Sequence, residues 1–161
     1  MTDVEAWSEF AVATAGAAAA LAGLLFVALS INLSAVLASP RTTARAASTL
    51  ILLASPVFLS LTLLVPFESS TAVGVVLLVL AALAAGALGT LLPRPTEQVP
   101  LPAWMLATVL PPIVLCGGTL LAGLGLLIGG LGGLIWLAPA IGFSLFGGLV
   151  GAWVLLVEIL R

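Results

Sequence analysis

Long apolar runs that contain almost no charged side chains constrain this chain more than any other feature of its sequence. About 20 consecutive apolar residues suffice for an α-helix to cross the hydrocarbon core of a bilayer. Only 6% of the 161 residues are charged and 63% are hydrophobic, whereas a soluble domain carries roughly a quarter charged residues. Because lipid offers no partner to backbone polar groups, such runs must satisfy them internally as helices. The sequence therefore predicts an all-α, polytopic transmembrane helical bundle. The lipid bilayer is the expected partner of its outer surface.

Prolines, glycines and charges interrupt the apolar runs at four places. Pro40 and Arg41 follow the first run, Pro66 ends the second, and a polar, proline-rich segment at 93–102 follows the third. Proline cannot continue a helix without losing a hydrogen bond, so these positions are expected to separate helices. The chain is expected to form one transmembrane domain over residues 1–161, with spans at about 10–37, 46–65, 71–92, 103–128 and 134–160.

The fourth interruption, Gly129–Gly133, contains no polar side chain. It is interpreted as a turn between two full spans, because the chain beyond Ala103 is long enough for two crossings. A re-entrant hairpin or one broken helix is the alternative. Either would leave free backbone groups that need protein or water around them.

The arginines predict an orientation. With five spans, all four arginines fall on one side of the membrane, and basic residues are retained on the cytoplasmic side. The N-terminus is therefore expected outside and the C-terminus inside, in a bacterial cytoplasmic (inner) membrane. Glu158 and Arg161, one helical turn apart, are expected to pair. The expected cytoplasmic residues are Arg41, Arg45, Arg94 and Arg161, and the expected outer residues are Asp3, Glu5, Glu9 and Glu68.

Composition argues against several classes of chemistry. The chain has no His and a single cysteine, Cys116, so neither the usual metal ligands nor a disulfide is expected. A net charge of −2 gives no basic surface for nucleic acid. No ionisable residue falls at a predicted bilayer centre, which disfavours proton or voltage coupling. We expect no enzymatic activity, no cofactor, no metal site and no nucleic-acid partner.

Small residues recur at three- and four-residue steps along several predicted spans, which places them on narrow helix faces. In lipid, such faces let two backbones approach closely and attract each other by dispersion. They indicate either packing within one subunit or an interface between subunits. The third span has two such pairs, Ala82–Gly86 and Ala85–Gly89. The candidate interface residues of the other spans are Gly16, Ala20, Gly23, Gly118, Ala122, Gly125, Gly147 and Gly151.

Polar side chains form a second candidate feature. Ser48, Ser55 and Thr62 share one face of the second span, and Pro56 leaves one backbone carbonyl there without a partner. The stripe indicates either a water-filled path or hydrogen bonds between helices. Asn32, near the end of the first span, is a candidate selectivity group or a helix-end hydrogen-bonding group.

The segment from Phe10 to Leu33 resembles the start of a family of small actinobacterial multi-span membrane proteins, and the similarity continues through Arg45 to Pro66. Some members carry the label of modulators of the FtsH membrane protease. The resemblance implies a bacterial inner membrane and no particular activity.

Two functional hypotheses follow. The first is a non-enzymatic membrane module that acts by assembling, as a homo-oligomer or as an accessory subunit of a membrane complex. The second is an oligomeric channel or uncoupled pore for small ions or solutes. An intramembrane enzyme is disfavoured because no nucleophile is accompanied by a base.

Overall fold

The computed structural model describes residues 7–91 and 104–159. This part of the chain contains no strand, and five of its helices are long and apolar enough to cross a membrane. The predicted all-α bundle with five spans is therefore confirmed. The long helices are α1 (Ser8–Ile31), α3 (Pro40–Leu64), α4 (Ser70–Leu91), α6 (Leu110–Ile128) and α7 (Leu137–Ile159). The short ones are α2 (Leu33–Leu37), the π-helix η2 (Met105–Val109) and the 3₁₀-helix η3 (Gly133–Trp136).

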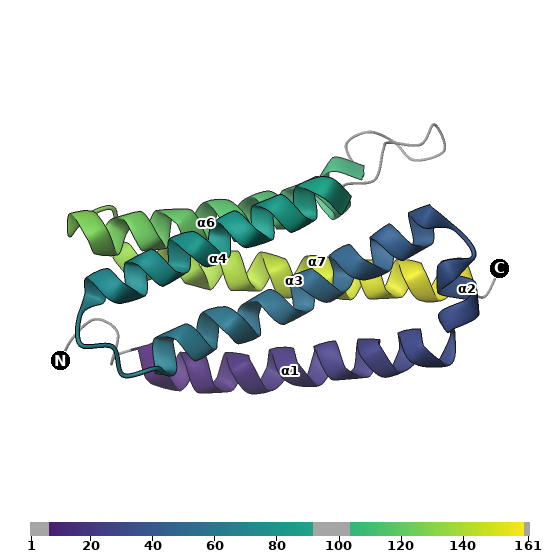
Figure 1. The fold of residues 1–161 in the computed structure, drawn as a ribbon, viewed down its shortest axis with the longest axis horizontal. Helices are drawn as coiled ribbons and strands as arrows, with labels where there is room; N and C mark the ends of the chain where they lie inside the picture. The colour runs from purple at the N-terminus through teal and green to yellow at the C-terminus, as the bar shows by residue number, and fades with distance from the viewer. Residues whose placement is uncertain (1–6, 92–103, 160–161) are drawn as a thin grey trace.

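The long helices lie side by side and alternate in direction along the chain (Figure 1). α3 packs against α1, α7 and α4, and α6 packs against α4 and α7. α1 lies at the edge of the bundle, where α3 is its main neighbour. This arrangement leaves most of the surface of α1 facing the surroundings.

The connection between the first two spans differs from the prediction. α1 ends at Ile31, Asn32 breaks the helix, and α3 begins at Pro40 instead of near residue 46. Ser39 is extended, and its hydroxyl accepts the backbone N–H of Arg41 at 3.2 Å. Proline is well tolerated at the first helical position, where its missing N–H would have no partner anyway. Pro40 therefore starts a helix here, although its place after an apolar run suggested an interruption.

The glycine segment after α6 forms a turn. The N–H groups of Gly129 and Gly130 both donate to the carbonyl of Gly125, at 3.0 and 3.1 Å. Gly129 and Gly132 have φ angles of 71° and 79°, which only glycine adopts at little cost. The flanking stretches, Met105–Ile128 and Gly133–Glu158, are 24 and 26 residues long. Each has the length of a full span, as expected for a turn and not for a re-entrant hairpin.

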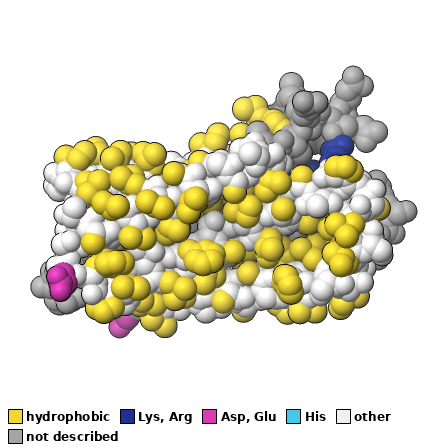
Figure 2. Space-filling model, in the orientation of Figure 1, with side chains coloured by type: hydrophobic (Ala, Val, Ile, Leu, Met, Phe, Trp, Pro, Cys, Tyr) yellow, Lys and Arg dark blue, Asp and Glu magenta, His cyan; other side chains and the backbone are white. Residues whose placement is uncertain are grey.

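Charged side chains gather at the two ends of the bundle (Figure 2). Glu9 begins α1 and Glu68 lies in the loop between α3 and α4, at the same end. Arg41 and Arg45 lie in the first turns of α3, at the opposite end. The described arginines thus lie at one end, as the five-span prediction requires, and Glu158 is the acidic residue that lies at that same end. Asp3, Glu5, Arg94 and Arg161 lie outside the described residues.

Glycines allow α4 and α6 to cross at close range. A Cβ atom built at Gly74 would lie 3.0 Å from the carbonyl oxygen of Gly123, and one built at Gly123 would lie 2.9 Å from the carbonyl oxygen of Gly74. Because both obstacles are backbone atoms, they cannot rotate away. Gly74 and Gly123 do not belong to a regular small-residue stripe, so the sequence pattern does not predict this crossing.

This crossing generates a stability prediction. Gly123→Ala should lower the free energy of unfolding by about 1–3 kcal/mol, because the added methyl group overpacks the crossing. Gly117→Ala on the same helix is the matched control, since no atom lies within 4 Å of its Cβ position. It should be neutral or stabilise by up to about 1 kcal/mol through helix propensity. Reversible unfolding of both variants in mixed micelles measures the difference, and equal effects would contradict the packing argument.

Candidate functional site

The small-residue faces of α6 and α7 are used inside the bundle. A Cβ atom at Gly118 would lie 2.8 Å from the Cβ atom of Ala140, and one at Gly151 would lie 2.5 Å from the Oγ1 atom of Thr49. These contacts show that α6 and α7 approach their neighbours almost backbone to backbone. The same holds for the remaining members, which are buried or in contact: Ala122, Gly125 against Gly133, and Gly147 against Pro111.

The small-residue face of α1 contacts nothing in the bundle. Gly16, Ala20 and Gly23 are all exposed, and no atom lies within 4 Å of the Cβ positions of the two glycines. α1 instead packs through the side that contains Ala11 and Ala18, which are fully buried. At about 100° per residue, the small face lies on roughly the opposite side of the helix. The face is therefore directed outward, away from the bundle.

A second face of this kind lies on α4. Ala82, Ala85, Gly86 and Gly89 are exposed, and neither glycine has an atom within 4 Å of its Cβ position. The buried side of α4 is the one that packs against α6. The chain thus has two unpartnered small-residue faces, one on α1 and one on α4.

The hydroxyl groups of the predicted polar stripe all bond within their own helix. Ser48 donates to the carbonyl of Arg45 at 2.9 Å, Ser55 to that of Ile51 at 2.7 Å, and Thr62 to that of Phe58 at 2.9 Å. Ser48 and Ser55 line two different hollows, and Thr62 lines neither. The structure places the three residues on one helix but does not bring them together along one cavity.

Asn32 lies at the break between α1 and α2. Its side-chain amide donates to the carbonyl of Ala28 at 3.0 Å, and its own carbonyl accepts the N–H of Val36 at 3.0 Å. The first bond caps a carbonyl in the last turn of α1, where carbonyls lack helical partners, and the second bond starts α2. In the part of the chain that the structure describes, no hydrogen bond joins Asn32 to the hydroxyls of α3.

The shortest hydrogen bond between two helices in the described residues lies at the α3–α7 interface. Pro56 has no N–H, so the carbonyl of Leu52, four residues earlier, lacks its helical partner. The hydroxyl of Ser144 on α7 donates to this carbonyl at 2.6 Å, and Ser144 is fully buried. The sequence predicts the free carbonyl, but the hydroxyl of Ser55, beside Pro56, does not donate to it and bonds to Ile51 instead. The donor comes instead from 92 positions further along the chain.

An ion pair closes this interface at the basic end of the bundle. Arg45 on α3 lies 3.5 Å from the carboxylate of Glu158 on α7, and their side chains are 19% and 37% exposed. Glu158 was expected to pair with Arg161, which lies outside the described residues. The spacing of Glu158 and Arg161 suggested a local pair, and nothing in the sequence indicates a partner 113 positions away.

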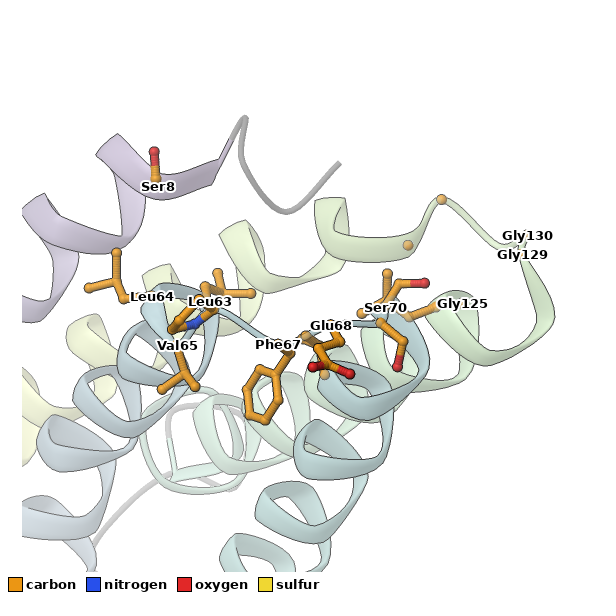
Figure 3. A pocket seen from close by; sticks show the side chains of 16 residues that line it. Ser8, Leu63, Leu64, Val65, Phe67, Glu68, Ser70, Gly125, Gly129 and Gly130 are labelled. Carbon is orange, nitrogen blue, oxygen red and sulfur yellow. The ribbon is translucent and has the colours of Figure 1, made fainter. Parts of the chain in front are cut away.

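A wide hollow lies at the acidic end. It measures about 1160 Å³ and is lined by the start of α1, the α3–α4 loop and the glycine turn. Glu68 is its one charged side chain among the residues that line it, and Ser70 lies close by (Figure 3). Glycines and serines make up half of the lining residues, and larger side chains such as Leu63 and Phe67 make up the other half. Across residues 7–91 and 104–159, no three acidic, cysteine or histidine side chains come together as a metal site requires.

The Ser144 contact is testable by a double-mutant cycle. Ser144→Ala should destabilise the protein by about 0.6–1.7 kcal/mol, the range of hydrogen bonds between membrane helices. Pro56→Ala restores an N–H that bonds to the carbonyl of Leu52 within α3, so Ser144→Ala should cost less in that background. Ser55→Ala is the control and should change stability by less than about 0.5 kcal/mol. Additive effects of Ser144→Ala and Pro56→Ala would contradict the assigned partnership.

Comparison with known proteins gives no match to this chain, whether among protein-family models, curated proteins or solved structures.

Proposed function

We propose that the chain is a non-enzymatic membrane module that acts by helix-mediated assembly, as a homo-oligomer or as an accessory subunit of a larger membrane complex. One observation carries the proposal: the small-residue face of α1, formed by Gly16, Ala20 and Gly23, has no neighbour in the bundle.

The physical reason lies in how helices associate in lipid. Lipid tails are as apolar as leucine, so helices attract each other chiefly where small residues permit close approach. The bundle uses this device at the Gly74–Gly123 crossing and at the contact of Gly151 with Thr49. A glycine within a helix costs about 1 kcal/mol relative to alanine. Gly16 and Gly23 have no packing role in the bundle that would offset this cost, whereas a partner helix seated on them would.

The pore hypothesis has less support from the geometry. It is based on the stripe formed by Ser48, Ser55 and Thr62. Each of these hydroxyls donates to a backbone carbonyl of its own helix. The stripe does not line a single cavity. We therefore favour assembly over a pore. Ion flux through reconstituted liposomes is the measurement that would favour a pore instead.

The resemblance of the first two helices to actinobacterial membrane proteins fits an accessory role. α1 and α4 present their small faces to lipid, so a larger membrane complex has direct access to them. A modulator that works through its transmembrane helices needs no loop domain, and the described loops are short.

The assembly proposal predicts a specific loss of association. Ala20→Leu places a bulky side chain on the small face of α1 and should weaken self-association about tenfold, which corresponds to about 1.4 kcal/mol. Ala17→Leu is the matched control, since Ala17 is equally small and exposed but lies off the face. Native mass spectrometry across a dilution series in mild detergent measures both. A wild-type chain that is monomeric at all concentrations and co-purifies with no partner would refute the proposal.

We further propose that the end of the bundle that contains Arg41 and Arg45 faces the cytoplasm, because arginine is retained there during insertion. Single cysteines in a Cys116→Ala background test this orientation. Exposed positions 8 and 70 at the acidic end should react with an impermeant reagent added to intact cells, and exposed position 38 at the basic end should not. Labelling of position 38 alone would reverse the orientation.

A further inference from the structure

One carbonyl at the start of α6 has no donor within the described segment 104–128. In an α-helix the carbonyl of Ala107 would accept the N–H of residue 111, and in a π-helix that of residue 112. Both positions are prolines, Pro111 and Pro112, which have no N–H. The N–H just before them, that of Leu110, donates to the carbonyl of Met105 in the π-helix η2. The tandem prolines therefore leave the carbonyl of Ala107 without a helical partner.

A hollow of about 70 Å³ lies beside this break, at the basic end of the bundle, and Ala107 lines it. Helices α3, α4, α6 and α7 contribute the rest of its wall together with η2, and Arg45 is its one charged lining residue. The volume is several times the ~10–15 Å³ that one water molecule requires. The hollow is thus large enough for a small polar guest.

The lining offers both acceptors and donors. The hydroxyls of Ser48 and Thr49 donate to the carbonyl of Arg45, at 2.9 and 2.8 Å, so their oxygen lone pairs stay available to a donor in the hollow. The guanidinium of Arg45 carries five N–H donors, and its contact with Glu158, at 3.5 Å, engages one nitrogen atom. Thr108 adds a third hydroxyl-bearing residue to the wall.

This mixture of groups decides which kind of molecule suits the hollow. A hydrocarbon chain would leave the guanidinium of Arg45 and the carbonyl of Ala107 without partners. A metal cation would lie beside the positive charge of Arg45, and an anion would lie beside the carbonyl and hydroxyl oxygens. A neutral molecule that both donates and accepts hydrogen bonds meets none of these penalties. Water is such a molecule, and it satisfies carbonyls that proline frees in membrane helices.

We propose that ordered water occupies this hollow, where it donates to the carbonyl of Ala107 and accepts from the guanidinium of Arg45. The water supplies the donor that Pro111 and Pro112 remove, and so lets α6 begin with tandem prolines between neighbouring helices. It also gives Arg45 a polar neighbour besides Glu158. The site is separate from the proposed assembly face, since α1 contributes no residue to its wall.

Radiolytic footprinting of the full chain in detergent micelles tests the proposal, because X-rays convert bound water into hydroxyl radicals that oxidise the nearest side chains. Leu88 lines the hollow and is only 3% exposed. Leu77 on the same helix is fully buried and lines no hollow described above. Leu88 should be oxidised about fivefold faster than Leu77, since only Leu88 lies beside a site that holds water. Leu115, which lines the apolar lateral groove of about 330 Å³ between α3, α4 and α6, should react as slowly as Leu77.

A matched pair of proline variants tests the role of the carbonyl. Pro111 is fully buried and does not line the hollow, so Pro111→Ala restores an N–H to Ala107 and leaves the wall in place. Oxidation of Leu88 should fall about threefold in this variant, because the water loses its acceptor. Pro56→Ala is the control, since it restores an N–H elsewhere and should leave the rate at Leu88 unchanged.

Mass spectrometry of the oxidised peptides reads out every arm, and the comparison within the wild type needs no substitution, so it stands even where a variant fails to fold. Equally slow oxidation of Leu88 and Leu77 in the wild type would overturn the proposal. Equal changes in Pro111→Ala and Pro56→Ala would also overturn it, because they would indicate general loosening of the bundle and not the loss of one acceptor.

Discussion

The free carbonyl of Leu52 is the constraint around which the centre of the bundle is built. Pro56 removes its helical donor, and in lipid no water stands ready to replace it. Ser144 supplies the donor at 2.6 Å, and it can do so only because α7 approaches α3 closely. Gly148 and Gly151 permit this approach, since a side chain at either would collide with Leu53 or Thr49. The close contact between α3 and α7 therefore depends jointly on the glycines of α7, on Pro56 of α3 and on the buried hydroxyl of Ser144.

The other features of the bundle follow from the same shortage of polar partners. The hydroxyls of Ser55 on α3 and Thr119 on α6 donate to carbonyls of their own helices, so the lateral groove presents an apolar lining although it contains both residues. The described charged side chains lie at the two ends of the bundle, where solvating charge costs least. The outer surface of the bundle is otherwise apolar and has two shallow faces of small residues, on α1 and α4, and one apolar groove between α3, α4 and α6. The two small-residue faces are the ones on which the proposed assembly depends.

The number of spans could be predicted from sequence, because apolar length and helix-breaking residues act locally. The bounds between the first two spans were predicted wrongly, because Pro40 suggested an interruption, whereas Ser39 accepts the N–H of Arg41 and a helix starts there. Prediction also failed where a residue's role depends on its neighbours in space. The pairing of Arg45 with Glu158, and of Leu52 with Ser144, joins residues that no periodicity connects. Likewise, sequence identifies a face of small residues but not whether that face is covered. Gly118 and Gly16 belong to similar patterns, and only the first touches a neighbouring helix.

The contact between Leu52 and Ser144 also has a consequence for time. The two residues are 92 positions apart, and a bacterial ribosome adds about 5–20 residues per second. The hydroxyl of Ser144 is therefore synthesised about 5–20 s after the carbonyl of Leu52. Until α7 is made, the carbonyl of Leu52 lacks the donor that it has in the finished bundle. A chain that stops short of α7 therefore leaves this carbonyl without a partner at a depth where lipid supplies none.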